Sequence, residues 1–188
     1  MLIEKGPSLK NIMDNKLVLL TGAGGGIGLE AAYALAYMGA KVIIAEVNKE
    51  RIAHAKKAIV NKCLEGYIDF YEIDLANEEQ VCKMVSYIID TYGCPDVVFN
   101  NATITPLGTV EEVSLEIWDK SYAVNFRAPL LLTKLFLPFM KKRNSGTIVF
   151  VSSSGAAPYM GAYEIFKTAQ VELSNTLSGE LENIKVYT

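Results

Sequence analysis

The chain has 188 residues, the size of one domain, and its 18 basic and 21 acidic side chains give a net charge of −3. This balance predicts no nucleic-acid binding, which needs an excess of positive charge. Hydrophobic residues make up 51% of the chain, which excludes a disordered polypeptide. No apolar run reaches the roughly 18 residues of a membrane-spanning helix. The three cysteines lack metal-site spacing and there is one histidine, so we expect no metal site and a reduced, cytoplasmic setting.

Apolar runs of strand length alternate with segments of helical period along the chain. We expect strands at residues 16–21, 41–47, 67–74, 96–100, 147–152 and 184–187. We expect helices at residues 27–38, 49–63, 78–92, 115–143 with a break near Pro129, and 162–182. This alternation predicts an α/β fold: a Rossmann-type, doubly wound parallel sheet in three layers, α/β/α. Residues 1–14 are expected to be a polar leader, and residues 15–188 a single domain.

A glycine-rich turn joins the first expected strand to the first expected helix. Glycines at this point allow a sharp turn and bring main-chain N–H groups close to a pyrophosphate, which the helix N-terminus attracts. The Lys-Ser or Lys-Thr pair of a P-loop is missing, which excludes that motif. A methyltransferase-type glycine loop, or a turn without any ligand, stays open on this feature alone. The expected cofactor-binding residues here are Thr21, Gly22, Gly24, Gly25, Gly26, Ile27 and Gly28.

Acidic residues end the second and third expected strands. Glu46 lies where a carboxylate accepts hydrogen bonds from ribose hydroxyls and repels a 2′-phosphate. No Arg or Lys lies in the glycine turn to attract that phosphate. We therefore expect NAD in preference to NADP, with a solvated strand-end glutamate as the alternative. Asp74 is placed either to face the adenine or to cap the end of its own strand.

Tyr163 and Lys167 are four residues apart and share one face of the last expected helix. A free tyrosine has a pKa of about 10, and a neighbouring ammonium favours its ionised form. Taken alone, this spacing is typical of ordinary helix-surface neighbours. Ser152, Ser153 and Ser154 follow the fifth expected strand, at the edge where parallel strands form a ligand crevice. A hydroxyl there is placed to hold a substrate oxygen beside Tyr163, unless the serines are only a polar strand exit.

The chain resembles the short-chain dehydrogenase/reductase family in motifs that keep the family's order over residues 16–188. The matching motifs are Thr21-Gly22-x-x-x-Gly26-Ile27-Gly28, Asp74-Leu75, Asn100-Asn101-Ala102, Asn125, Ser153 and Tyr163-x-x-x-Lys167. Each is weak alone, whereas the set is highly specific. The resemblance implies a Rossmann-type fold, a nicotinamide cofactor and an oxidoreductase that interconverts a secondary alcohol and a ketone by hydride transfer.

The resemblance also implies a role for each matching residue. Tyr163 corresponds to the general acid–base, and Ser153 to the residue that orients the substrate oxygen. Lys167 corresponds to the residue that holds the nicotinamide ribose and favours ionisation of the tyrosine, and Asn125 supports a water-linked proton relay behind it. The further cofactor contacts implied in this way are Tyr163, Lys167, Asp74, Leu75, Asn101 and Ala102.

Several features depart from the family pattern. Thr103 stands where the family has Gly, so its side chain is expected to narrow the approach to the cofactor or substrate. The interval from Ser153 to Tyr163 is shorter than usual, and Phe166 replaces a small residue before Lys167. Family members also extend beyond the point where this chain stops. We therefore expect a chain without the usual C-terminal substrate segment, either a fragment or a naturally short protein, with its sixth strand at an open edge.

The sequence thus predicts an NAD(P)-dependent oxidoreductase that uses NAD. The alternatives are a dinucleotide-binding protein or a truncated family member with little or no catalysis. The expected partner is a small-molecule alcohol or ketone, without nucleic acid or membrane. We also expect a homo-oligomer, a dimer or tetramer, in which helices around residues 125–140 and 162–181 pair with their copies. Their apolar side chains serve either that interface or the core.

Overall fold

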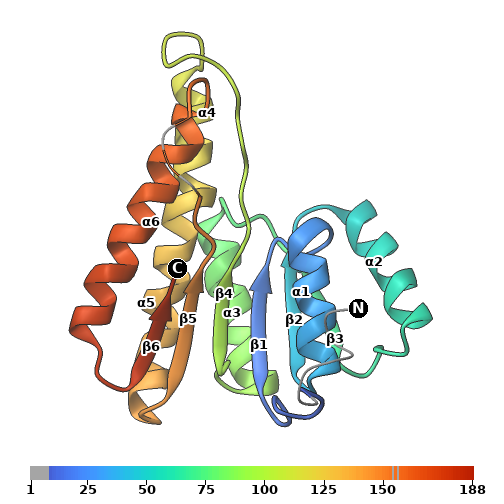
Figure 1. Ribbon diagram of the computed structural model, residues 1–188. Coiled ribbons are helices and arrows are strands. Elements are labelled where there is room, and N and C mark those ends of the chain that lie inside the picture. Colours follow the sequence, from blue (N-terminus) through green and yellow to red (C-terminus); the bar gives the residue numbers. More distant parts are fainter. Residues whose placement is uncertain (1–8, 154, 156) are drawn as a thin grey trace.

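The computed structural model describes residues 9–153, 155 and 157–188, which form a six-stranded parallel sheet flanked by helices (Figure 1). Residues 1–8 of the expected leader and Ser154 lie outside the described residues. The strands are β1 (Leu17–Thr21), β2 (Lys41–Glu46), β3 (Ile68–Glu72), β4 (Val97–Asn100), β5 (Gly146–Phe150) and β6 (Ile184–Tyr187). They lie in the order β3-β2-β1-β4-β5-β6. This order confirms the predicted doubly wound α/β fold.

The helices follow the predicted alternation with the strands. They are α1 (Gly26–Tyr37), α2 (Lys49–Asn61), α3 (Glu78–Tyr92), α4 (Leu115–Tyr122), α5 (Ala128–Lys142) and α6 (Gly161–Glu180), with a π-helical turn, η2 (Ala123–Arg127), between α4 and α5. Asn48 caps α2 as predicted, because its side chain accepts a hydrogen bond from Arg51 N at 2.9 Å.

The break expected near Pro129 in the long helical region falls just before this residue. Pro129 lies in the first turn of α5, where its missing N–H costs little. The interruption is instead η2, which holds Asn125. Single π-helical turns of this kind occur often at functional sites.

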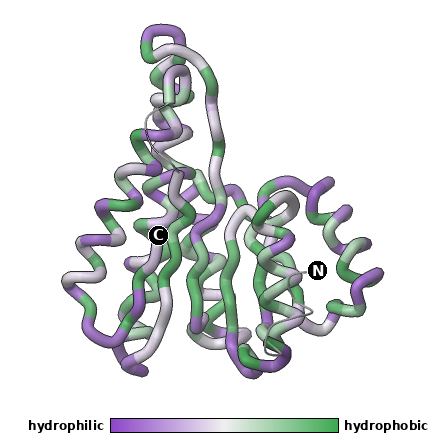
Figure 2. The backbone as a smooth tube through the Cα atoms, viewed as in Figure 1, coloured by the Kyte–Doolittle hydropathy of each residue, from purple (hydrophilic) through white to green (hydrophobic). Residues whose placement is uncertain are grey.

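The core forms on both faces of the sheet. Successive side chains of a strand point to opposite faces, so Leu17 and Leu19 of β1 pack in the cluster that includes α3 and α5, and Val18 and Leu20 pack in the cluster that includes α1. Strands buried on both sides are apolar throughout, which explains the unbroken apolar runs of the sequence. Figure 2 shows this pattern as green along the central strands.

Both ends of the described chain lie against the sheet. Met13 packs on the α1 side of the core, and its N–H donates to Met38 O at 2.9 Å. The strand β6 pairs with β5 at the sheet's edge. None of the described helices combines the length and apolarity that crossing a bilayer requires.

Parallel strands end on the same side of the sheet, and this positions the candidate site. The turn after β1, Glu46 at the end of β2, the segment after β4 and Ser153 after β5 all belong to this edge. Ligands of doubly wound sheets bind in the crevice at this edge, where the strand order reverses between β1 and β4.

Candidate functional site

The glycine turn is fixed to the end of β4 by close backbone contact. Gly22 has φ +64°, and a Cβ there would lie 2.5 Å from Ala102 Cα. Only glycine meets both requirements. On the other side, Thr21 Oγ1 accepts hydrogen bonds from the main-chain N–H groups of Asn101, at 3.1 Å, and Ala102, at 3.0 Å. Thr21 therefore braces the turn.

Asn101 adds a second connection between the turn and β4. Its side-chain Nδ2 donates to Thr21 O at 2.9 Å and to Gly22 O at 3.1 Å. A Cβ on Gly28 would lie 2.6 Å from this same Nδ2. Glycine at this position thus lets α1 approach the end of β4 closely.

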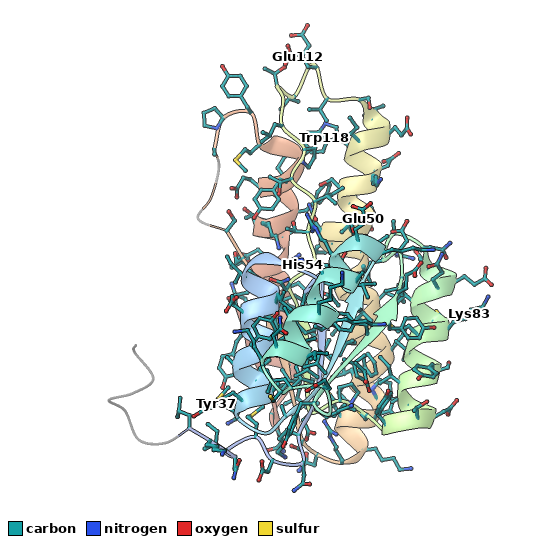
Figure 3. The ribbon with its side chains drawn as sticks, turned by 90° about the vertical axis from the view of Figure 1, so that its right-hand side faces the viewer. Tyr37, Glu50, His54, Lys83, Glu112 and Trp118 are labelled. Atoms are coloured by element: carbon teal, nitrogen blue, oxygen red, sulfur yellow. The ribbon has the colours of Figure 1, made fainter. Side chains whose placement is uncertain are left out.

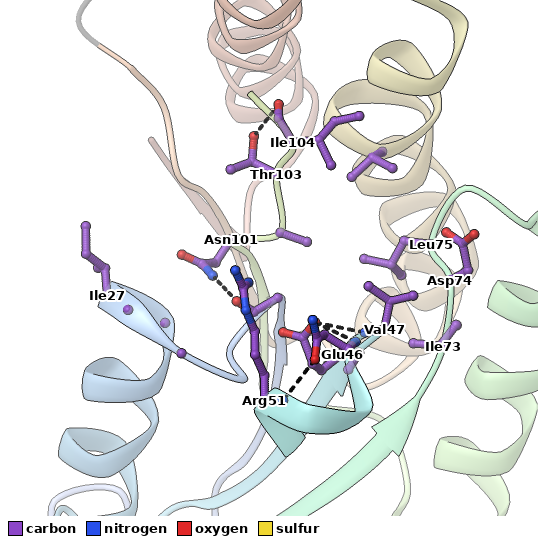
Figure 4. Close-up of a pocket in the computed structure, with 18 of the residues that line it drawn as sticks. Ile27, Glu46, Val47, Arg51, Ile73, Asp74, Leu75, Asn101, Thr103 and Ile104 are labelled. Carbon is purple, nitrogen blue, oxygen red and sulfur yellow. Dashed lines mark hydrogen bonds between the residues drawn. The ribbon is translucent and has the colours of Figure 1, made fainter. Parts of the chain in front are cut away.

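Gly25 and Gly26, by contrast, face open space, since a Cβ on either residue has no heavy atom within 4 Å. Gly25 is the N-cap of α1 and provides no side-chain cap, so the first N–H groups of the helix are left for another acceptor. An anion is the partner that such a helix start attracts. The two glycines border a cavity of about 700 Å³ (Figure 4), a volume in the range of small-molecule and cofactor sites. The residues present therefore fit a dinucleotide phosphate.

The cavity brings together most of the predicted cofactor-binding residues. Thr21, Gly24, Tyr163 and Lys167 are not among the residues that line it. The predicted residues that line it are Gly22, Gly25, Gly26, Ile27, Gly28, Glu46, Asp74, Leu75, Asn101 and Ala102.

The side chain of Glu46 stabilises the end of β2 through hydrogen bonds to the main chain. It is 4% exposed, and its Oε2 accepts a hydrogen bond from Gly24 N at 2.9 Å. Its Oε1 accepts from Val47 N and Asn48 N, both at 3.0 Å. Three main-chain N–H groups thus surround the carboxylate and fix it at the wall of the cavity.

Arg51 lines the same cavity, and the sequence analysis missed it. It lies in the first turn of α2 and is exposed, and Figure 4 shows its side chain rising beside Glu46. The signal that finds Arg51 is its place in the helix that starts directly after Glu46.

Asp74 caps the turn after its own strand and also borders the cavity. Its Oδ1 accepts a hydrogen bond from Ala76 N at 2.9 Å, so the side chain caps the turn that follows β3. It is also exposed and lines the cavity. Its second oxygen faces no donor in this turn, which leaves it available to a ligand.

The predicted catalytic residues form a separate group at the start of α6. Lys167 Nζ lies 5.9 Å from the ring centroid of Tyr163 and donates to Val151 O at 2.6 Å. Lys167 is 1% exposed, and burial lowers the pKa of its ammonium to about 8, while the charge of Glu164 opposes that shift. Ser153 Oγ donates to Glu164 Oε1 at 2.9 Å.

Asn125 joins this catalytic group to the cavity. Its buried Oδ1 accepts from Thr103 Oγ1 at 3.0 Å and from Ile104 N at 2.9 Å, and both partners line the cavity. The unusual side chain of Thr103 is therefore tied to Asn125. The main-chain oxygen of Asn125 accepts a hydrogen bond from Gln170 Nε2.

The sequence analysis missed three polar residues around this group. Glu164 and Gln170 are buried on α6, and Ser121 is buried on α4, where its Oγ donates to the main-chain oxygen of Ala162. These residues could have been found in the sequence as polar side chains at helix positions that face the protein interior.

The large side chain of Phe166, which departs from the family pattern, has a packing role. The ring of Phe166 packs edge-on against Trp118 of α4, with centroids 6.1 Å apart, and Figure 3 shows Trp118 at the upper end of the molecule. The large side chain of Phe166 thus fills the contact between α4 and α6.

His54 is exposed on α2 (Figure 3) and takes no part in the catalytic group. Among the described residues, no group of three or more His, Cys, Asp or Glu is placed to hold a metal.

Comparison with known proteins decides the family. Residues 16–188 match the family model for short chain dehydrogenase. The chain belongs to the short-chain dehydrogenase/reductase family. An uncharacterized oxidoreductase of Thermotoga maritima is 38% identical over 166 residues, which are 87% of this chain and 64% of that protein. Dehydrogenase/reductase SDR family member 4 of Bos taurus is 33% identical over 187 residues, 96% of this chain and 66% of the relative. The chain thus spans about two thirds of their length.

Solved structures of short-chain dehydrogenases/reductases share the fold. A metagenomic short-chain oxidoreductase in complex with NADP has a TM-score of 0.86 at 26% identity, covering 93% of this chain and 80% of its own. A family member from Burkholderia phymatum in complex with NAD has a TM-score of 0.85 at 27% identity. The match covers 93% of this chain and 64% of the Burkholderia chain. The predicted family and fold are therefore confirmed.

Proposed function

We propose that the protein is an oxidoreductase that interconverts a secondary alcohol and a ketone, with NAD as cofactor and Tyr163 as general acid–base. The observation that carries this proposal is the link between the two halves of the site. Thr103 and Ile104 line the cavity at the glycine turn and bind Asn125, which lies beside the polar group of α6. A dinucleotide that starts at the glycine turn thus extends toward Tyr163.

The four predicted catalytic residues each have a defined task in this proposal. Tyr163 takes the hydroxyl proton as the alcohol becomes a ketone, and returns it in the reverse direction. Lys167 places a positive charge one helical turn from the phenol, and Ser153 orients the substrate oxygen. Asn125 positions Thr103 and Ile104 at the inner end of the cavity. When bound, the nicotinamide supplies or accepts the hydride at the substrate carbon.

NAD is the cofactor that the charge of Glu46 favours. Its carboxylate lies at the cavity wall and repels a 2′-phosphate. Arg51 acts in the opposite direction, because a guanidinium attracts that phosphate. We give Glu46 the greater weight since it is buried and fixed by three main-chain N–H groups, whereas Arg51 is exposed to screening solvent.

Tyr163→Phe tests the proposal with the loss of one oxygen atom. We expect turnover to fall by about 1,000-fold, because the proton acceptor is gone, while NADH binding stays unchanged. The assay follows NADH absorbance across a panel of secondary alcohols and ketones, and fluorescence titration measures NADH binding. Tyr37→Phe, which removes the same atom from an exposed residue of α1, is the control.

Two outcomes overturn this assignment. Turnover by Tyr163→Phe at more than a tenth of the wild-type rate rules out the role of the tyrosine. NADH binding without any turnover by the folded wild-type chain supports the alternative, a dinucleotide-binding protein without catalysis.

A homodimer through α5 and α6 is part of the same proposal. Phe139 of α5 is 42% exposed and Ile165 of α6 is 53% exposed, which supports a second copy as the partner of this face. Sedimentation equilibrium measures the mass of the assembly. A folded monomer at micromolar concentration contradicts this part.

A further inference from the structure

The carboxyl group of Glu164 lies inside the proposed catalytic group, although no role has yet been given to it. Glu164 directly follows Tyr163 on α6 and is 5% exposed. Its Oε1 accepts the hydrogen bond from Ser153 Oγ at 2.9 Å. Within the described part of the chain, its buried Oε2 has no hydrogen-bond partner. A carboxylate is costly to bury unless it is paired, so this placement calls for a function.

The bond to Glu164 determines what Ser153 offers to a substrate. A serine hydroxyl has one hydrogen and two lone pairs. In this structure the hydrogen points to Glu164 Oε1, so only lone pairs are left for another partner. In this state Ser153 accepts a hydrogen bond from the O–H of an alcohol and donates none to a ketone oxygen. The carboxylate thus favours the alcohol in the substrate position.

Glu164 also acts on the charge of Lys167. Burial favours the neutral amine, and the negative charge of Glu164 works against that effect. Ser121, Asn125 and Gln170 are further buried polar side chains in this region, all uncharged, and Asn125 is hydrogen-bonded to the other two. The Tyr163 ring centroid lies 5.9 Å from Lys167 Nζ, and Lys120 of α4 lines the cavity and is exposed to solvent. Glu164 precedes Lys167 by three residues on α6, a spacing that places the two buried side chains on one side of the helix.

We propose that Glu164 is a positioning residue that keeps Ser153 as a hydrogen-bond acceptor for an alcohol and keeps Lys167 protonated. This inference rests on the proposed function, because Ser153 and Lys167 are given their roles there. It adds a preference for the alcohol over the ketone in the ground-state complex. This preference originates in the carboxylate of Glu164, since neither the glycine turn nor Tyr163 supplies it.

Glu164→Gln tests the charge with nearly the same shape. We expect the titration midpoint of Lys167 to fall by about one pH unit relative to wild type, because the counter-charge is lost. NMR of protein with 13C-labelled lysine measures this midpoint, and Lys167→Met assigns the signal. Glu172→Gln on the exposed face of α6 is the matched control and leaves the midpoint unchanged. An unchanged midpoint in Glu164→Gln overturns the counter-charge role.

Glu164→Asp tests the hold on Ser153 separately, since it keeps the charge and shortens the side chain by one methylene. We expect its Lys167 midpoint to stay near that of wild type while Ser153 becomes free to donate. The measurement is inhibition by the alcohol with NADH bound and by the ketone with NAD bound, using the most active pair of the substrate panel. The ratio of ketone to alcohol inhibition constants falls about tenfold in this variant, or 1.4 kcal/mol. A ratio equal to that of wild type overturns the role on Ser153.

The two variants keep this inference distinct from the proposed function. The Lys167 titration needs neither cofactor nor turnover, so it tests Glu164 even if the wild-type chain oxidises no alcohol. If Glu164→Gln does not fold, as circular dichroism reports, Glu164→Asp still decides the role on Ser153 through the ratio of inhibition constants. A Lys167 midpoint in Glu164→Asp that differs from wild type by a full unit contradicts a role for the charge alone.

Discussion

Between the glycine turn and the end of β2, main-chain N–H groups surround the carboxylate of Glu46, whereas around Lys167 the polar side chains bond one another and the nearby main chain. The first region depends on backbone conformation, and its side of the cavity is left open by Gly25 and Gly26. In the second region a buried ammonium, a carboxylate and a hydroxyl depend on each other. Substitutions in the turn should therefore separate folding from binding, while those around Lys167 should change several properties together.

Substitutions at two glycines of the same turn should show the clearest separation between an effect on cofactor binding and an effect on folding. Gly25→Val adds a side chain to an extended residue with no atom near its Cβ, so the chain should fold normally. The side chain fills the mouth of the cavity, and NADH affinity should fall by about 100-fold, or 2.7 kcal/mol. Calorimetric titration and thermal unfolding measure the two effects.

Gly22→Ala is the matched opposite. It combines φ +64° with a Cβ 2.5 Å from Ala102 Cα, so we expect a loss of about 3 kcal/mol in unfolding free energy. If Gly25→Val unfolds as easily as Gly22→Ala, or binds NADH like wild type, the division of this turn into a braced part and an open part is wrong.

Lys167→Met should show how the second region couples charge to stability. Folding lowers the pKa of Lys167 from 10.5 to about 8, so the unfolded chain binds more protons between these values. Wild-type stability therefore gains from this group as the pH rises from 8 to 10.5. At pH 7 the variant should be more stable than wild type by up to about 3 kcal/mol, with the difference vanishing toward pH 10. Turnover should be lost at every pH.

Urea unfolding at a series of pH values measures this difference. Lys141→Met, at an exposed position of α5, is the control and should show no such pH dependence. A stability difference between Lys167→Met and wild type that is constant from pH 7 to 10 contradicts the buried ammonium.

Arg51→Ala should have the smallest effect, because the charge is exposed. We expect wild type to bind NADH more tightly than NADPH. The variant should lose about fivefold in NADPH affinity, or 1 kcal/mol, with little change for NADH. Lys49→Ala, on the same helix but paired with Glu72, is the control. Tighter binding of NADPH than NADH by wild type is the result that refutes the proposed preference.

The fold was largely predictable because its signals are local. The strands are apolar runs, Asn48 is a cap, and the glycine turn lies between a strand and a helix. The break near Pro129 was predicted, but its π-helical form was not, because a π-helical turn has no sequence signature as strong as a proline.

The site was predictable where a motif names the residue, and incomplete where contacts arise only on folding. Arg51 reaches the cavity because α2 starts beside Glu46, which a scan limited to the glycine turn does not include. Glu164 and Ser153 are eleven residues apart in the sequence, and their hydrogen bond forms only on folding. Gln170 likewise reaches the main-chain oxygen of Asn125 from another helix.

The central claim is that one crevice holds a dinucleotide from the glycine turn to Tyr163. A crystal structure with bound NADH tests it most directly. The account predicts the pyrophosphate against the N–H groups at the start of α1, and the nicotinamide within about 4 Å of the Tyr163 hydroxyl. A dinucleotide bound elsewhere, or one with its nicotinamide at Arg51 and its adenine at Tyr163, contradicts it.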